Sequence, residues 1–316
     1  MRYILLFASV CSVIVASNAF SFPFIGGNIQ VKRHSIVDLD SFRNATYKPE
    51  VGLTFAKYES PFQSRWKPQP KKPTAIFISG IEFSALSLAQ YANTMRRDYN
   101  LVYLCCSSST SETHPIDKIV DSIEEYILEN ELKNVTLIGE SSGAIIALHT
   151  GLRPALSLKG VVLMNSATAY PGSKMNEFID FCQDIRDFEY QIAISLFLAT
   201  QKVEVFAMDA FNFRLMVLML LNLFLFPREV FVSRLNTWII GGIEHLKGKL
   251  DTYPHKVLIV AANQDEMFDS YEEAKVLHKR LPSSVIVHAP ACGHLITAEK
   301  FPLRDVINHY LPYADP

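Results

Sequence analysis

The chain has 316 residues, 49% of them hydrophobic, and a formal net charge of −2 at neutral pH. This length and apolar content suffice for one large buried core, so a single domain with an insertion is expected. The near-neutral charge argues against nucleic acid as a partner, and the sequence holds neither a phosphate-binding glycine loop nor Cys/His spacing typical of a metal site. No cofactor and no metal are therefore predicted.

Residues 1–19 have the pattern of a cleaved signal peptide. Arg2 gives a positively charged start, an apolar run covers residues 4–15, and residues 17–19 (Ser-Asn-Ala) are typical of a cleavage site. A membrane anchor is the alternative interpretation, but the apolar run is short for a bilayer span. The sequence therefore predicts entry into the secretory route.

The junction between Ala19 and Phe20 resembles the signal/transit junction of nucleus-encoded plastid proteins in algae with complex plastids. That resemblance implies a plastid location, with residues 20–63 forming an N-terminal extension that contains the transit segment. Plain secretion is the alternative, because acidic residues nearly balance basic residues in this stretch.

From residue 74 onward, apolar strand-like runs alternate with helical segments. Such alternation is typical of a doubly wound, mostly parallel α/β sheet, here expected within a domain over residues 64–316. Strands are predicted at 74–79, 100–105, 134–139, 159–164, 256–262 and 284–289, and helices at 84–97, 116–130, 142–152 and 270–281.

A nucleophilic serine is predicted between a strand and a helix. Residues 139–143 (Gly-Glu-Ser-Ser-Gly) have the G-x-S-x-G pattern, which places a serine hydroxyl at the tip of a sharp strand-to-helix turn. Glycines at both ends of the pattern remove the Cβ atoms that would collide in so tight a turn. The pattern predicts Ser141 as the nucleophile of an α/β-hydrolase fold.

An attacking serine also needs hydrogen-bond donors for the negatively charged oxygen of the tetrahedral intermediate. One expected donor is the backbone N–H of Ser142, the residue after the nucleophile. The other is expected from the loop after the first predicted strand, residues 79–83 (Ser-Gly-Ile-Glu-Phe), where the N–H of Ile81 is favoured.

Ser141 further needs a general base and a carboxylate that orients this base. Asp265 and His294 each follow a predicted strand, where open α/β sheets place their active sites, and they complete the order Ser, acid, His. Asp269 is the competing acid, but it lies four residues further on and is expected inside the helix that begins near Ser270. The sequence therefore predicts Ser141, Asp265 and His294 as a catalytic triad.

The stretch between the predicted strands 159–164 and 256–262 is too long for a plain crossover. It predicts a helical cap at about 172–250, inserted between the sixth and seventh strands of the fold. Within it, residues 211–226 are apolar on nearly every helical face, and as a helix they would span only ~24 Å, less than a bilayer core. Two interpretations stay open: a buried cap helix, or a helix that contacts lipid or lines an acyl site.

Several blocks of the chain resemble segments of the plant and algal esterase/lipase/thioesterase family, which includes phytyl ester synthases and related diacylglycerol acyltransferases. The blocks are Ile78–Glu82, Leu137–Gly143, Leu163–Thr168, Asp265–Ala274 and Cys292–Leu295. The resemblance covers roughly residues 64–300 and implies that the three triad candidates occupy the family's triad positions. The chain departs from the family at Phe83 and Ala144, where the family has glycine. No His is followed by an Asp five residues later, so a counterpart of the family's C-terminal acyltransferase domain is not expected in these residues.

The sequence predicts a serine-dependent, esterase- or lipase-like hydrolase that acts on lipid acyl esters through an acyl-Ser141 intermediate. One alternative is a plastid acyltransferase that esterifies phytol, a xanthophyll or a glycerolipid. Another is a non-catalytic binding protein with the hydrolase fold. The expected partner is a small-molecule lipid ester, and peripheral membrane contact through residues 211–226 is a further hypothesis.

Overall fold

A computed structural model describes a large part of the chain, with gaps. The described residues are 47–48, 53–57, 72–81, 86–106, 116–167, 174–187, 189–190, 228–265, 268–294, 296 and 301–312. The predicted signal peptide (1–19) and the apolar segment 211–226 lie outside these residues.

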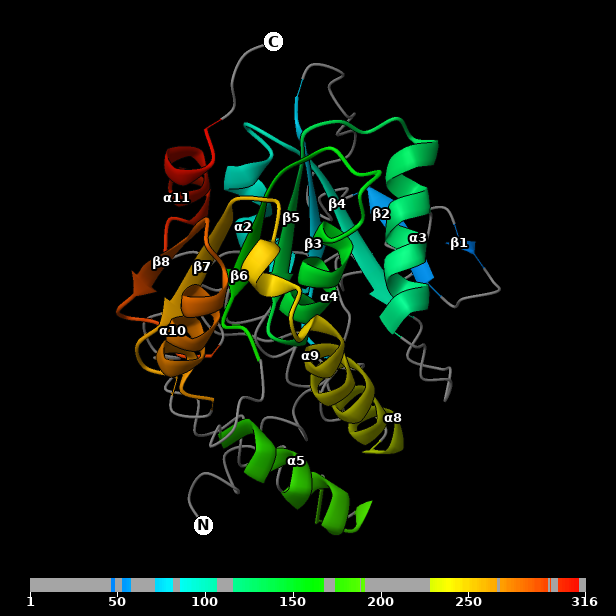
Figure 1. Ribbon diagram of the computed structural model, residues 1–316, viewed down its shortest axis with the longest axis vertical. Helices are drawn as coiled ribbons and strands as arrows, with labels where there is room; N and C mark the ends of the chain where they lie inside the picture. The colour runs from blue at the N-terminus through cyan, green and yellow to red at the C-terminus, as the bar shows by residue number, and fades with distance from the viewer. Residues whose placement is uncertain are drawn as a thin grey trace, which may run out of the picture.

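The core is one eight-stranded sheet between two layers of helices (Figure 1). The strands are β1 Tyr47–Lys48, β2 Leu53–Lys57, β3 Thr74–Ile78, β4 Asn100–Cys106, β5 Val135–Glu140, β6 Leu158–Met164, β7 Val257–Ala262 and β8 Ser284–Ala289. Their order across the sheet is β1-β2-β4-β3-β5-β6-β7-β8. The six strands β3 to β8 are parallel, whereas β1 and β2 add an antiparallel edge.

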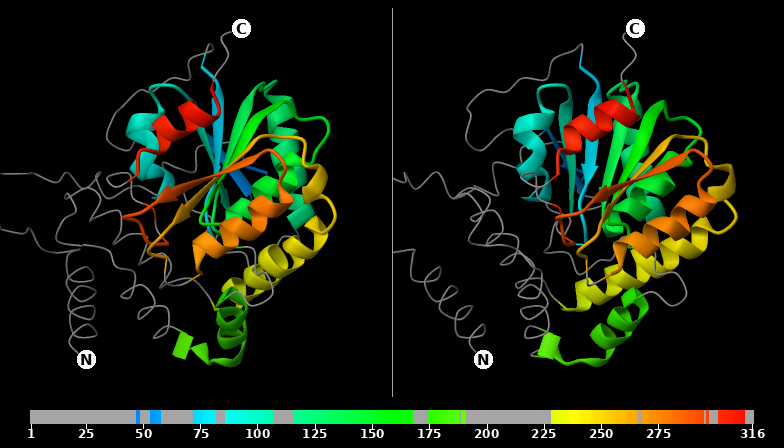
Figure 2. Two further views of the ribbon diagram at one scale, coloured as in Figure 1. Left: turned by 60° about the vertical axis from the view of Figure 1, so that its left-hand side comes forward. Right: turned by 90° about the vertical axis from the view of Figure 1, so that its left-hand side faces the viewer.

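Helices cover both faces of the sheet, which Figure 2 shows nearly edge-on. One face carries α3 Ile116–Glu129, α4 Ser142–Gly151, α9 Gly241–Leu246 and α10 Ser270–Arg280. The other face carries α2 Leu86–Met95 and α11 Leu303–Tyr310. Beyond the sheet, α5 Lys174–Asp184 and α8 Arg228–Arg234 form the cap, and α8 continues through the π-helix η4 Leu235–Ile240 into α9. A short 3₁₀ helix, η5 Leu250–Thr252, leads to β7.

Strand β3 shows why the central strands are apolar without interruption. Its side chains alternate between the two faces: Ile76 and Ile78 pack in the cluster below α3 and α4, whereas Ala75 and Phe77 pack in the cluster below α2 and α11. A strand that is buried on both faces needs apolar residues at successive positions, so its sequence does not alternate between apolar and polar.

The expected α/β fold is confirmed, and its strands end close to the predicted positions. The helical cap lies between β6 and β7, as predicted. Strands β1 and β2 were not expected, and both lie within residues 20–63, so part of the segment assigned to the N-terminal extension belongs to the sheet. Within the described ranges, no helix combines the length and apolar character needed to cross a membrane.

Candidate active site

Ser141 occupies the turn between β5 and α4 in a strained backbone conformation. Its φ is 54° and its ψ is −120°, an uncommon combination for a residue with a Cβ atom. Its backbone N–H donates a hydrogen bond of 2.8 Å to the carbonyl of Met164 at the end of β6. The turn is therefore held against the neighbouring strand, and the surrounding structure fixes the direction of the Ser141 side chain.

The glycines on either side of Ser141 have the steric role that the sequence predicts. A Cβ atom on Gly143 would lie 2.2 Å from the carbonyl oxygen of Ile78 and 2.4 Å from that of Ser79. A Cβ atom on Gly139 would lie 2.4 Å from the carbonyl oxygen of Gly143. Residues 139–143 form the sharp turn between β5 and α4, called the elbow below. The two ends of the elbow pack closely against each other, and Gly143 also packs against the loop after β3, where the second oxyanion donor is predicted.

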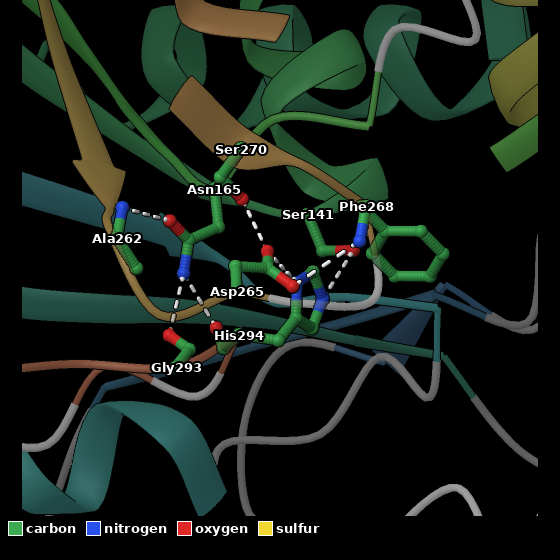
Figure 3. Close-up of polar contacts among 8 residues, drawn as sticks. All are labelled: Ser141, Asn165, Ala262, Asp265, Phe268, Ser270, Gly293 and His294. Atoms are coloured by element: carbon green, nitrogen blue, oxygen red, sulfur yellow. Dashed lines mark hydrogen bonds and ion pairs between the residues drawn. The ribbon is translucent and has the colours of Figure 1, made fainter. Parts of the chain in front are cut away.

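The structure brings the three predicted triad residues together (Figure 3). The Nε2 atom of His294 lies 3.3 Å from Oγ of Ser141, and its Nδ1 atom lies 2.8 Å from Oδ2 of Asp265. Asp265 and His294 are both buried. With Nδ1–H donating to the carboxylate, Nε2 is left as an acceptor directed at the serine hydroxyl.

Asp265 is surrounded by donors that favour its ionised form. Oδ2 also accepts a hydrogen bond from the hydroxyl of Ser270, and Oδ1 accepts one of 3.2 Å from the backbone N–H of Phe268. Burial is the largest influence and raises the pKa of the Asp265 carboxyl, but the charge of His294 and these hydrogen bonds outweigh it and lower the pKa overall. The carboxylate therefore stays charged beside the imidazole.

The competing acid, Asp269, lies just before α10 and not inside the helix, where the sequence predicts it. Its φ is 52°, in the left-handed region, and its side chain makes no capping hydrogen bond to the helix. The carboxylate in contact with His294 is that of Asp265. The geometry thus favours Asp265 over Asp269 as the orienting acid.

Asn165 supports the loop that carries His294, a role that the sequence did not indicate, although the residue lies in the block Leu163–Thr168. Its amide donates to the carbonyls of Gly293 at 3.2 Å and His294 at 2.6 Å, and its Oδ1 accepts from the N–H of Ala262 at 2.9 Å. The side chain is buried, and its backbone φ is 45°. Asn165 therefore joins the end of β7 to the loop that carries His294.

We expect Asn165→Asp to slow turnover and to lower stability. A carboxylate cannot donate to two carbonyls, and each buried group left unsatisfied costs about 1–3 kcal/mol. Denaturant unfolding and ester turnover would measure both effects. Asn308→Asp is the matched control, because Asn308 lies in α11 and its amide donates to Asp98 and not to the loop that carries His294. Equal turnover losses in the two variants would contradict a role of Asn165 in placing His294.

The two predicted oxyanion donors lie on segments that meet at the elbow. Ser142 is the first residue of α4, and the first N–H groups of a helix have no partner within it and lie at its positive end. Ile81 lies in the turn after β3, the loop that touches Gly143. Within the described ranges, no group of three or more metal-binding side chains is found.

A series of aromatic side chains connects the cap to the triad through Phe268, which lies between β7 and α10. The ring of Phe268 packs edge to face against His294, with centroids 4.6 Å apart, and it contacts Phe178 of α5 at 5.7 Å. Phe178 in turn packs against Phe231 of α8 at 6.1 Å. These rings belong to an apolar cluster that also includes Ile81. The catalytic histidine candidate is therefore covered by apolar groups on the cap side.

Comparison with solved structures shows that the chain has the α/β-hydrolase fold. A hydrolase from Pseudomonas aeruginosa matches with a TM-score of 0.62 and 14% identity, covering 83% of this chain and 94% of that one. An esterase from Exiguobacterium antarcticum matches with 0.60 and 15%, covering 83% and 96%. A membrane phospholipase A, described as a bacterial virulence factor, matches with 0.64 and 15%, covering 98% and 96%.

The chain also has distant similarity to the hydrolase region of phytyl ester synthase 1, a chloroplastic protein of Arabidopsis thaliana. The two are 21% identical over an alignment of 255 residues that covers 74% of this chain and 36% of the relative. The chain thus spans about a third of the length of that relative. No family model matches the chain.

Proposed function

We propose that the protein is a serine hydrolase that cleaves lipid acyl esters through an acyl-Ser141 intermediate. The observation that carries this proposal is the hydrogen-bonded series from Ser141 through His294 to Asp265, with Ser141 on a strained elbow. A serine, an imidazole and a buried carboxylate in this order form the arrangement that activates a hydroxyl for acyl transfer.

In the proposed reaction, Nε2 of His294 accepts the Ser141 proton while Oγ attacks the ester carbonyl. The N–H groups of Ser142 and Ile81 stabilise the negatively charged oxygen of the tetrahedral intermediate. His294 then returns its proton to the departing alcohol, which leaves an acyl-Ser141 ester. Water, activated by the same imidazole, releases the acid, and the carboxylate of Asp265 stabilises the imidazolium in both steps.

The apolar side chains between the cap and His294 favour the proposal that the substrate has a long acyl chain. The contact of Phe268 with both His294 and Phe178 places hydrophobic surface beside the reacting serine. Each methylene group buried there contributes about 0.8 kcal/mol. The name of the relative, phytyl ester synthase, points to the same class of ester, and membrane contact through residues 211–226 would deliver such substrates.

Acyl transfer to an alcohol is the second candidate function. Phytol, a xanthophyll or a glycerolipid hydroxyl would replace water in the second step, and the apolar cover over His294 favours this by limiting access of water. A plastid location would suit this reaction, and the chloroplastic relative and the Ala19–Phe20 junction support it. A fluorescent fusion of the full chain in an alga with complex plastids tests the location.

An acyl-chain series tests the substrate class. We expect kcat/KM to rise from acetyl to palmitoyl esters, and Phe178→Ala to lower palmitoyl turnover more than acetyl turnover. Phe181→Ala is the matched control, because Phe181 lies on the same helix and is 49% exposed. A parallel loss on both esters with a lower melting temperature would assign Phe178 to cap stability alone.

Product analysis with and without phytol separates hydrolysis from acyl transfer.

A further inference from the structure

A buried arginine connects the cap to the loop that carries the predicted oxyanion donor. Arg234 is the last residue of α8 and is only 1% exposed. Its Nη1 donates a hydrogen bond of 2.7 Å to the carbonyl oxygen of Ile81. Hydrogen bonds from a charged donor are stronger than neutral ones, and a buried guanidinium requires such partners.

The arginine is itself held in place. Its guanidinium lies over the ring of Trp238, 4.7 Å from the centroid, and Trp238 is fully buried in the core beneath the helices. The π-helix η4 begins at the next residue after Arg234. Such π turns are rare and frequently occur at functional sites.

The helix that carries Arg234 is also fixed to the helix that follows the nucleophile. A Cβ atom on Gly242 of α9 would lie 2.6 Å from Cγ2 of Ile145 in α4, so any larger residue here would require the Ile145 side chain to move. The carbonyl oxygen of Gly242 lies 2.8 Å from Nε2 of His149, also in α4. The segment 228–246 therefore contacts both sides of the predicted oxyanion hole: α4 directly, and Ile81 through Arg234.

The loop between β3 and Ile81 is consequently held at two points. Ile78 is paired in the sheet with Leu104 and Gly139, and Ile81 is bound by Arg234. The hydrogen bond from Arg234 holds the peptide plane that follows the Cα atom of Ile81. The N–H of Ile81 lies in the preceding plane, which the sheet pairing of Ile78 restricts from the other side, so the two attachments together limit the orientations open to this N–H. Oxyanion stabilisation depends on donors that are already in position, and a displacement of about 1 Å lowers the rate severely.

We propose that Arg234 is a positioning residue for the oxyanion loop and couples the placement of the cap to catalysis. The inference rests on the proposed esterase function, because the N–H of Ile81 stabilises an oxyanion only if Ser141 attacks an ester. Arg234 does not touch the substrate in this scheme. It acts through Ile81.

Arg234→Ala is expected to lower kcat for an acetyl ester by roughly 10- to 100-fold, with little change in KM. Guanidinium at low millimolar concentration should restore part of kcat, because it can refill the space and donate to Ile81. Arg234→Lys should be intermediate, since an ammonium donates to a carbonyl but lacks the planar guanidinium. Steady-state kinetics and melting temperatures of all variants give the readout, with sodium chloride as the control for ionic strength.

Arg228→Ala is the matched control. Arg228 lies on the same helix and donates to the carbonyl of Gln183 at 2.6 Å, a bond within the cap. We expect this variant to lose stability but to keep kcat, and guanidinium should not increase its activity. Equal kcat in Arg234→Ala and Arg228→Ala, or a loss that guanidinium fails to restore, would overturn the proposal.

Two further outcomes separate this proposal from the proposed function. If the wild type does not react with a fluorophosphonate, the esterase function fails and the role of Arg234 fails with it. If the wild type reacts and Arg234→Ala reacts equally fast, only the role of Arg234 is overturned. Should Arg234→Ala not fold, Arg234→Lys decides: a lower kcat at unchanged melting temperature supports the proposal, and a wild-type kcat contradicts it.

Discussion

Replacement of Ser141 by alanine is expected to lower ester turnover by roughly 10⁴-fold or more and to abolish covalent labelling by a fluorophosphonate. Its hydroxyl is the oxygen that lies 3.3 Å from Nε2 of His294, and no methyl group can attack a carbonyl. The fold should survive, because alanine and serine share the same steric limits at a φ of 54°. Melting temperature, labelling and turnover of the purified variant measure these effects.

Ser166→Ala is the matched control for this experiment. Ser166 follows the end of β6 beside the elbow, and its buried hydroxyl has no hydrogen-bond partner among the described residues. Its removal should leave both labelling and turnover close to wild type. Labelling that persists in Ser141→Ala would place the nucleophile elsewhere. A wild type that does not react at all would favour the non-catalytic binding protein.

The parallel strands could be predicted from the sequence because both of their faces are buried. Strand β7 is buried along its whole length and is apolar at every position, Val257–Ala262, so its bounds are marked by the change to polar neighbours. Strands β1 and β2 lack this signal. They lie at the antiparallel edge of the sheet, where β1 pairs with β2 and β2 pairs with β4, and this pairing rather than their own hydrophobicity makes them strands.

The triad candidates could be found because the elbow has a local pattern and the other two residues follow strands in a fixed order. The supporting residues have no such signal. Asn165 binds the His294 carbonyl from 129 positions away, and Arg234 binds the Ile81 carbonyl from 153 positions away. Both interactions end on backbone oxygens, which every residue has. Only the folded structure shows which carbonyl a given side chain meets.

Asp265→Asn is expected to lower turnover by roughly 10³- to 10⁴-fold while the chain still folds. The carboxylate accepts from Nδ1 of His294 through Oδ2, which also accepts from Ser270. An amide in its place is neutral and can present its own N–H to the imidazole. This would favour the tautomer that carries its proton on Nε2, which cannot accept the proton of Ser141. The pH dependence of kcat/KM and the labelling rate measure the loss.

Asp269→Asn provides the comparison that assigns the acid. Asp269 has a φ of 52°, which asparagine tolerates well, and its side chain makes no capping bond to α10. We therefore expect turnover close to wild type in this variant. The reverse pattern, with Asp269→Asn inactive and Asp265→Asn active, would make Asp269 the orienting acid in solution. Because both substitutions remove one negative charge from the same loop, a difference between them reports the direct contact with His294 rather than a change in the overall charge of the site.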